Sequence, residues 1–130
     1  MIVVIILISM LLAGIGWLVN EKNAKYLLSG YNTLNESQRK QFDLPGYLYL
    51  FRRFHLIMGT SMMLIGLSVF YFYGVRVGGL FLAIYPVVGY IIFAYRTDYF
   101  WRRTGSNLNK VGLVVLLISL LMVLLLFLLI

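Results

Sequence analysis

One histidine and four carboxylates are the side chains of this sequence that could carry out acid–base or metal chemistry. The histidine, His55, lies two residues after Arg53 and three after Arg52, and these two cations would oppose protonation of its ring. The carboxylates form no D-x-D, H-x-E or E-x-x-H pattern, and cysteine is absent. We therefore expect a protein that is not an enzyme, with no catalytic residue, metal ligand or cofactor.

The composition points instead to a membrane. Of the 130 residues, 62% are hydrophobic and only 12% are charged. Such a chain has too few polar groups to cover a water-soluble globule of its size. The net charge of +7 fits either a nucleic-acid partner or an anionic membrane surface, so the positions of the basic residues must decide between them.

Four apolar segments are each about long enough to cross, as a helix, a hydrocarbon core roughly 30 Å thick. A cleaved signal peptide is the competing interpretation of the first segment, but no Lys or Arg precedes it and no A-x-A-like cleavage site follows it. A tight turn around Gly74 to Gly79 joins the second and third. We predict an all-α, single-domain integral membrane bundle of four transmembrane helices, at residues 1–19, 54–75, 77–95 and 111–130.

The basic residues set the orientation of this bundle. Ten of the eleven lie in two loops, 20–53 and 96–110, whereas Arg76 lies in the turn between the second and third spans. The positive-inside rule then places both loops in the cytoplasm and both termini on the outer side of a bacterial inner membrane. Topology and anionic headgroups account for the basic surplus, so no nucleic-acid partner is expected. The carboxylates lie in the same two loops: Glu21, Glu36, Asp43 and Asp98.

Aromatic residues gather near the ends of the predicted spans. Amphipathic rings favour the depth of the membrane interface, so we predict an interfacial belt at the cytoplasmic ends. Its members include Tyr47, Phe51, Phe54, Phe100 and Trp101.

The longest polar stretch of the chain lies between the first two spans. Thr33 and Glu36 have the spacing of a capping box, which predicts a helix over about 34–42 that ends before Pro45. Leu34 and Phe42 would give this helix a thin apolar edge, so that it rests on the cytoplasmic membrane surface. The preceding Gly30-Tyr31-Asn32 favours a turn, and the alternative is that Asn32 and Thr33 line a binding site.

This stretch, "SGYNTLNESQRKQFD", follows an N-terminal span and precedes a second one. It resembles the family of small bacterial membrane proteins known as the domain of unknown function numbered 3784. The resemblance rests on a Gly-Tyr-Asn-Thr turn, a capped charged helix and a terminal Asp, and it extends over about residues 5–75. It implies a small bacterial inner-membrane protein and no particular reaction or ligand. The matching positions are Gly30, Tyr31, Asn32, Thr33, Glu36 and Asp43.

A weaker similarity points to the multi-spanning immunity proteins of the SdpI type. It rests on Tyr95, Arg96 and Thr97, which resemble a Tyr-Arg-Thr turn at a helix end in those proteins. This similarity suggests an immunity function as an alternative.

The predicted spans carry packing signals and no ionisable residue near their centres, so a transporter acting alone is not expected. Small-xxx-small and heptad spacings allow close helix approach, either within this chain or with another protein. Pro86 with Gly89 predicts a kink in the third span, which either fits the bundle or shapes a groove. The fourth span is Leu-rich on all sides and is expected to face lipid or to dock loosely. The packing candidates are Ser9, Ala13, Gly59, Gly66, Gly79 and Ala83.

Contact surfaces without a reactive centre favour a non-catalytic accessory subunit of a larger bacterial membrane complex. One alternative is an immunity-type protein against a membrane-active toxin. Another is a lipid- or small-molecule-handling protein with a groove at Pro86 and Gly89. The expected partners are other membrane subunits and anionic headgroups, with contacts at Tyr31, Asn32, Thr33, Arg39, Lys40, Arg52 and Arg53.

Overall fold

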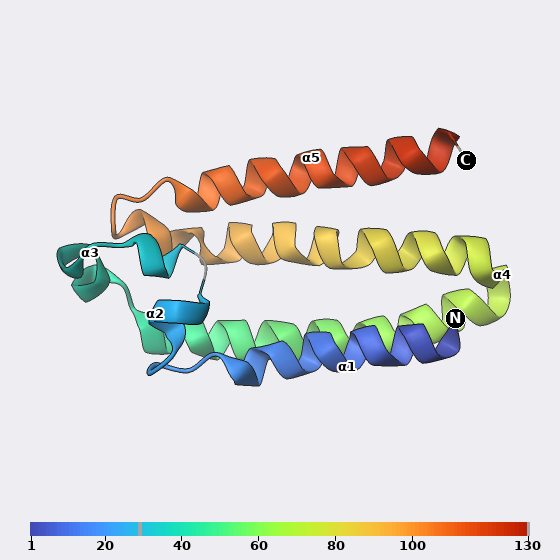
Figure 1. Cartoon of the computed structure of the whole chain (residues 1–130), viewed down its shortest axis with the longest axis horizontal. Coiled ribbons are helices and arrows are strands. Elements are labelled where there is room, and N and C mark those ends of the chain that lie inside the picture. The colour runs from blue at the N-terminus through green and yellow to red at the C-terminus, as the bar shows by residue number, and fades with distance from the viewer. Residues whose placement is uncertain (29, 130) are drawn as a thin grey trace.

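The computed structural model describes residues 1–28 and 30–129, and every regular element in these ranges is helical (Figure 1). The prediction of an all-α protein is confirmed, whereas its division into four membrane spans stays a prediction. Residue 130, the end of the predicted fourth span, lies outside the described residues. The elements are α1 (Ile2–Leu18), α2 (Ala24–Leu27), the 3-10 helix η1 (Tyr31–Thr33), α3 (Glu36–Gln41), α4 (Leu44–Arg102) and α5 (Leu108–Leu129).

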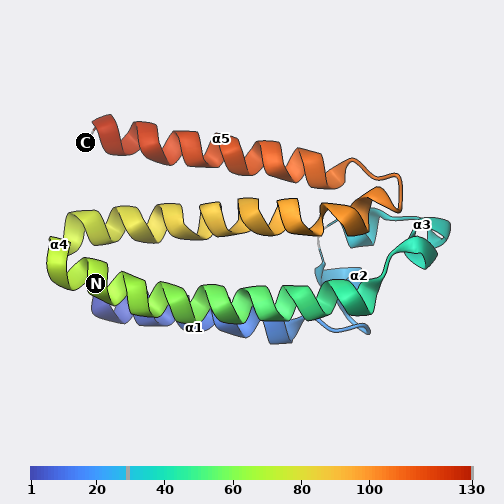
Figure 2. The same cartoon turned by 180° about the vertical axis from the view of Figure 1, so that it is seen from behind.

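The long element α4 is a helical hairpin. Its chain reverses at Gly74, whose φ of 78° and ψ of −172° are not helical. A positive φ is open to glycine at little cost, because no Cβ clashes with the backbone. The expected tight turn is thus made at the first of the residues proposed for it, and it separates two antiparallel arms, 44–73 and 75–102 (Figures 1 and 2).

Both arms extend beyond the predicted spans into what the sequence suggested were loops. The Asp43 carboxylate accepts a hydrogen bond from the Gly46 amide at 3.1 Å and so caps the first arm. Pro45 occupies the first turn, where its missing N–H costs nothing. The preceding helix does end before Pro45, at Gln41, but Leu44 is itself helical, so the expectation that Pro45 keeps Leu44 out of a helix is wrong.

The remaining helices lie along this hairpin. Figures 1 and 2 show α1 beside the first arm and α5 beside the second, with both termini at the Gly74 end and the short elements at the opposite end. We refer to that opposite end as the head. By length and composition α4 and α5 are long and apolar enough to cross a membrane, and α1 is a shorter apolar helix.

The short helix α3 begins two residues later than the sequence suggested. Asn35, not Thr33, is its N-cap: the Asn35 side chain accepts from the Gln38 amide at 2.8 Å, and the Gln38 side chain accepts from the Asn35 amide at 3.0 Å. Thr33 belongs to η1, and its hydroxyl donates to the Gly30 carbonyl. The capping box of Thr33 with Glu36 is wrong, because Leu34 between them is extended and buried.

The head encloses an aromatic core. Tyr47 meets the rings of Phe100 and Trp101 at centroid distances of 5.7 and 5.9 Å, and Phe42 lies 4.9 Å from Trp101. These four rings are each at most 7% exposed, and burial raises the pKa of the Tyr47 phenol. Tyr47, Phe100 and Trp101, which were predicted to lie in an interfacial belt, pack with Phe42 in this core, and the belt itself stays a prediction. Leu34 and Phe42 likewise face this core and do not form an apolar edge of α3.

Candidate functional site

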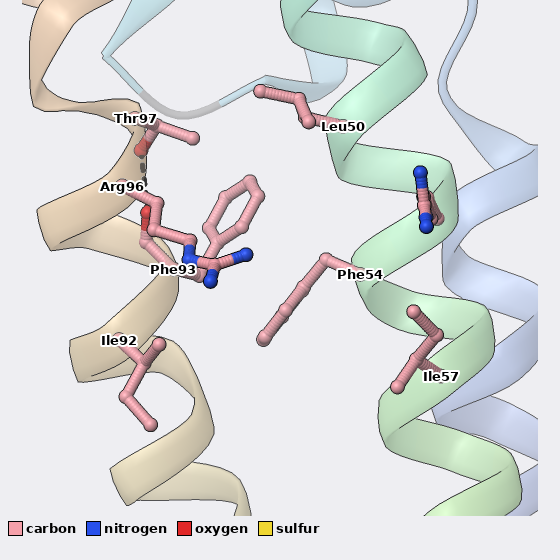
Figure 3. A pocket seen from close by; sticks show the side chains of 8 residues that line it. Leu50, Phe54, Ile57, Ile92, Phe93, Arg96 and Thr97 are labelled. Atoms are coloured by element: carbon pink, nitrogen blue, oxygen red, sulfur yellow. Dashed lines mark hydrogen bonds between the residues drawn. The ribbon is translucent and has the colours of Figure 1, made fainter.

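A pocket of about 330 Å³ opens between the two arms of α4, close to the head (Figure 3). The first arm contributes Leu50, Arg53, Phe54 and Ile57. The second arm contributes Ile92, Phe93, Arg96 and Thr97. Each set keeps the i, i+3 or i+4 spacing that places side chains on one face of a helix, so the hairpin alone brings the two faces together.

Aromatic packing fixes the register of the arms at this pocket. The rings of Phe54 and Phe93 stack with their centroids 4.4 Å apart, and Figure 3 shows them projecting toward each other from opposite arms. The Thr97 hydroxyl donates to the Phe93 carbonyl at 2.8 Å and so satisfies itself within its own helix. Apart from its two arginines, the wall of the pocket is therefore apolar, because its one hydroxyl already has a partner.

Two cations stand at this apolar pocket. Arg53 and Arg96 are both exposed, and neither has a hydrogen bond or an ion pair with another described side chain. The Arg96 guanidinium extends from its helix into the space between the arms (Figure 3). A guanidinium binds carboxylate or phosphate oxygens through paired N–H groups. The pocket therefore combines two guanidinium groups that can bind an anion with a lining that is otherwise mostly apolar.

The nearest carboxylate is committed elsewhere. Asp98 forms an ion pair with Arg102 one turn along the same helix, and it accepts a hydrogen bond from the Asn109 amide at 3.0 Å. The hydrogen bond from Asn109, followed by Arg102, lowers the pKa of Asp98. Its charge is therefore kept, but it is directed at Arg102 and α5 and not at the two pocket arginines.

Two further cavities follow this pocket down the hairpin, and we refer to the three together as the groove. A cavity of about 200 Å³ shares Phe54, Ile57 and Ile92 with it, and a further one of about 400 Å³ shares Tyr85 and Val88 with the second. From residue 50 to residue 73 the first arm is about 35 Å long at 1.5 Å per residue. The groove therefore follows the hairpin from the head to near the Gly74 turn.

The groove has few polar atoms and a narrow waist. The hydroxyls of Ser61 and Tyr85 bond to each other at 2.6 Å across the arms. A Cβ on Gly89 would lie 2.6 Å from the Met58 sulfur, so this glycine lets the arms approach closely. Backbone dihedrals stay helical through Pro86, and the predicted kink there does not interrupt the arm.

This arrangement lies within the region matched by a known family. The model described as Domain of unknown function (DUF3784) matches residues 4–99. The chain belongs to this family. No curated protein and no solved structure matches it. The similarity to SdpI-type immunity proteins stays a prediction.

The DUF3784 match reaches further than the resemblance in the polar stretch suggested. It covers α1, the Gly-Tyr-Asn-Thr turn and nearly all of the α4 hairpin, including both sides of the groove. The helix α5 begins after the matched residues. The groove between the arms is therefore part of the DUF3784 region, and α5 lies outside it.

The predicted contact residues of the Gly-Tyr-Asn-Thr turn lie together at the head. The Arg39 guanidinium donates to the Asn32 carbonyl at 3.0 Å and lies 5.7 Å from the ring centroid of Tyr31. Asn32 and Thr33 are exposed beside them. Arg39 thus serves the fold of its own turn, which lowers its availability to a partner.

The other predicted cations of this DUF3784 protein are dispersed. Lys40 is exposed on α3, whereas Arg52 donates to the Val19 carbonyl at 3.4 Å and lies 5.9 Å from the ring centroid of Trp17. Of the predicted contact residues, only Arg53 lines the groove. The structure therefore does not gather the predicted contact residues into one surface.

The small residues also divide into two groups. A Cβ on Gly59 would lie 2.6 Å from both the Ser9 carbonyl oxygen and the Ala13 amide nitrogen, so these residues form the crossing of α1 with the first arm. Gly66 is buried between Ile5 and Phe81. By contrast, Gly79 has only the Met1 side chain within 4 Å, and Ala83 is exposed.

Sequence reasoning missed the partners of Arg53 in the groove. Arg96 entered it only as a topological charge and as part of a weak motif, and Phe93 was not singled out. The sequence does contain a signal. Arg53 directly precedes the second predicted span and Arg96 directly follows the third, and each lies next to an aromatic residue, Phe54 and Tyr95. Their pairing depends on the register of the hairpin, which no local pattern encodes.

Proposed function

We propose that this DUF3784 protein is a multi-pass protein of the bacterial inner membrane, with both termini on the outer side. Two long apolar helices and a shorter one support this placement. Both termini and Arg76 lie at the Gly74 end, whereas the other ten basic residues belong to the segments at the head (Figure 1). One charge-rich end and one charge-poor end is the asymmetry that the positive-inside rule describes.

Within that membrane, the proposed function is to hold one anionic phospholipid in the groove of the α4 hairpin. The observation that carries this proposal is the position of Arg53 and Arg96, two cations without partners among the described residues, at the head of an apolar groove. A phosphodiester has oxygens for both guanidinium groups. An acyl chain fits the groove below, because its lining is apolar and follows the arms.

Charge favours an anionic over a zwitterionic lipid. The chain has eleven basic residues and only four carboxylates. The carboxylate nearest the groove, Asp98, is paired with Arg102. A zwitterionic headgroup would place its ammonium group in this positive field, whereas phosphatidylglycerol places no cation there. This arrangement supports the lipid-handling alternative, now with the headgroup and the groove specified.

Native mass spectrometry of the purified protein tests the proposal. Released from nanodiscs that contain phosphatidylcholine and phosphatidylglycerol, the protein should retain one phosphatidylglycerol. Arg53→Gln with Arg96→Gln should weaken that retention about tenfold or more, since charge-assisted hydrogen bonds contribute about 1.5–3 kcal/mol each.

The matched control is Lys22→Gln with Lys25→Gln, which removes the same charge from exposed positions elsewhere at the head. This pair should leave retention unchanged. An equal loss in both double variants would mean diffuse attraction to the head and would contradict a lipid site between the arms. Inorganic phosphate should not compete, because it lacks the chain that the groove accepts.

The accessory-subunit and immunity functions stay predictions. Copurification after gentle detergent extraction addresses the first, and survival of a deletion strain exposed to competitors' secretions addresses the second. A partner present in stoichiometric amount would extend the phospholipid proposal, because a lipid between the arms can also support an interface.

A further inference from the structure

A second and larger cavity lies on the other side of Phe93 and Thr97, two residues that line both this cavity and the phospholipid pocket. Its volume is about 690 Å³, which is within the range of ligand pockets, about 300–1,000 Å³. It is an open cavity lined by the end of α2, the turn before α3, both arms of α4 and the beginning of α5. None of its lining residues carries a formal charge.

Three of its polar side chains have used their donor hydrogens on the protein. The Thr33 hydroxyl donates to the Gly30 carbonyl at 2.6 Å, and the Thr97 hydroxyl donates to the Phe93 carbonyl at 2.8 Å. The Asn109 amide nitrogen donates to the Ala94 carbonyl at 2.8 Å and to Asp98. What these side chains retain is oxygen lone pairs, which can only accept.

A fourth polar side chain, Tyr90, is in the same condition, whereas the Tyr47 hydroxyl and the Trp101 indole N–H have no hydrogen-bond partner among the described residues and remain donors. His55 is 1% exposed and faces no carboxylate within the described residues, so its ring is neutral and has one N–H. That N–H is on Nδ1, which lies 2.8 Å from the Phe51 carbonyl oxygen, an atom that can only accept. Nε2 must therefore accept from the Tyr90 hydroxyl at 2.9 Å, and the Tyr90 oxygen keeps only acceptor capacity.

The cavity therefore combines four acceptors with the Tyr47 and Trp101 donors, which suits a ligand that both donates and accepts hydrogen bonds. Hydroxyl groups do both, whereas an ammonium group can only donate. The head carries ten of the eleven basic residues of the chain, and this positive field opposes a cation. Clustered hydroxyls meet no such opposition. The Asn32 side chain, exposed at the rim, adds both a donor and an acceptor.

We propose that this cavity binds the neutral sugar head of a glycolipid, with its chain lying against Val111 and Leu116 of α5. It is a second site, with a ligand class different from that of the phospholipid groove, and it does not depend on that groove being occupied. The two arginines of the groove do not line it.

Tryptophan fluorescence tests this site directly. The chain has two tryptophans, and Trp17→Phe leaves Trp101, which lines the cavity, as the sole reporter. Nanodiscs of phosphatidylcholine should give a saturable change in Trp101 emission when they contain monoglucosyldiacylglycerol. Diacylglycerol, which lacks the sugar, should give none. An equal response to both lipids would overturn the proposal, as would a stronger response to stearylamine.

Variants of Thr33 locate the binding. Thr33 is exposed, so Thr33→Val should fold normally, yet it should weaken glycolipid binding about fivefold through loss of one acceptor. Thr33→Ser should restore affinity, and Thr60→Val, which removes an exposed hydroxyl outside the cavity, should not change it. Unchanged affinity in Thr33→Val and in Tyr90→Phe would overturn the proposal. Retention of phosphatidylglycerol by Thr33→Val should equal that of the parent protein, so the two sites fail or succeed separately.

Discussion

Helices α1 and α5 pack against the same hairpin in opposite ways. Along α1, Ile5 and Ser9 are at most 2% exposed, and the backbone approaches the first arm so closely that Gly59 admits no Cβ. Along α5, none of the described residues is buried. One flank of α4 is therefore a tight interface and the other is open.

The difference follows from side-chain size at the crossing. Between apolar helices in lipid there is little hydrophobic driving force, so close packing and polar links decide how firmly they associate. Small residues in α1 and the first arm permit that packing. The Leu-rich α5 is instead held near its ends, where Asn109 bonds to Asp98 and the Arg76 guanidinium lies 5.3 Å from the ring centroid of Phe127. The larger cavity lies where this looser helix begins.

The largest loss of stability is expected from overpacking the interface between α1 and the first arm of α4. Gly59→Ala would place a Cβ 2.6 Å from backbone atoms of α1, which cannot rotate away, so the free energy of unfolding should fall by at least about 2 kcal/mol. Gly112→Ala in α5, where nothing lies within 4 Å, is the control and should change little. Reversible unfolding in mixed detergent micelles measures both. Similar losses in the two variants would remove the contrast between α1 and α5.

A smaller effect is expected inside the hairpin that both helices contact. Tyr90→Phe leaves the buried His55 Nε2 without its donor and should cost about 1–2 kcal/mol of unfolding free energy. Tyr95→Phe, at a ring that is 78% exposed, is the matched control and should cost nothing measurable. If the two changes were equivalent in the same assay, the hydrogen bond between the arms would not contribute to stability.

The segment that joins α1 to the hairpin gives a third test. Asn35→Ala removes the cap of α3 and should cost about 1 kcal/mol. Glu36→Ala should cost less, because Glu36 takes no part in the observed capping box. Hydrogen exchange at residues 36–41 measures the local effect. A larger increase in exchange for Glu36→Ala would instead support the Thr33 cap.

The smallest effect on stability is expected at the hydrogen bond from Asn109 to Asp98, which links α5 to the second arm. Because the Asn109 hydrogen bond lowers the pKa of Asp98 in the folded protein, it stabilises the fold above the ordinary carboxylate pKa. This contribution is lost as the pH falls through the lowered value. Asn109→Ala should raise the Asp98 pKa toward its ordinary range, as measured by carbon NMR of the side-chain carboxyl group. An unchanged pKa would mean that Arg102 alone sets it.

Local features of the fold could be predicted from the sequence when one residue type decided them. The turn at Gly74 needed a positive φ, and the glycine between two apolar runs indicated it. The α3 cap was harder, because Thr33 with Glu36 and Asn35 with Gln38 have the same spacing. The aromatic core of the head decides between them by burying Leu34, which belongs to neither pair.

A groove at Gly89 was among the predicted alternatives, but its arginine end could not be predicted, because that end depends on how two distant segments align. Arg53 and Arg96 line the same pocket only because Phe54 stacks on Phe93 and sets the register of the arms. Likewise, the acceptor character of the larger cavity depends on which carbonyl each hydroxyl reaches, as at Thr97. The helix crossing at Ser9, Ala13 and Gly59 was easier to predict from the sequence, because the spacing of small residues alone marks a helix-crossing face.

The most direct measurement for the phospholipid groove is photocrosslinking with a phosphatidylglycerol that carries a diazirine on its acyl chain. Peptide mapping should find adducts concentrated at Ile57, Val88 and Ile92, and the Arg53→Gln and Arg96→Gln double variant should lose them. Adducts spread over exposed positions of α1 and α5, such as Leu11 and Leu121, and insensitive to that double variant, would contradict a lipid held between the arms of α4.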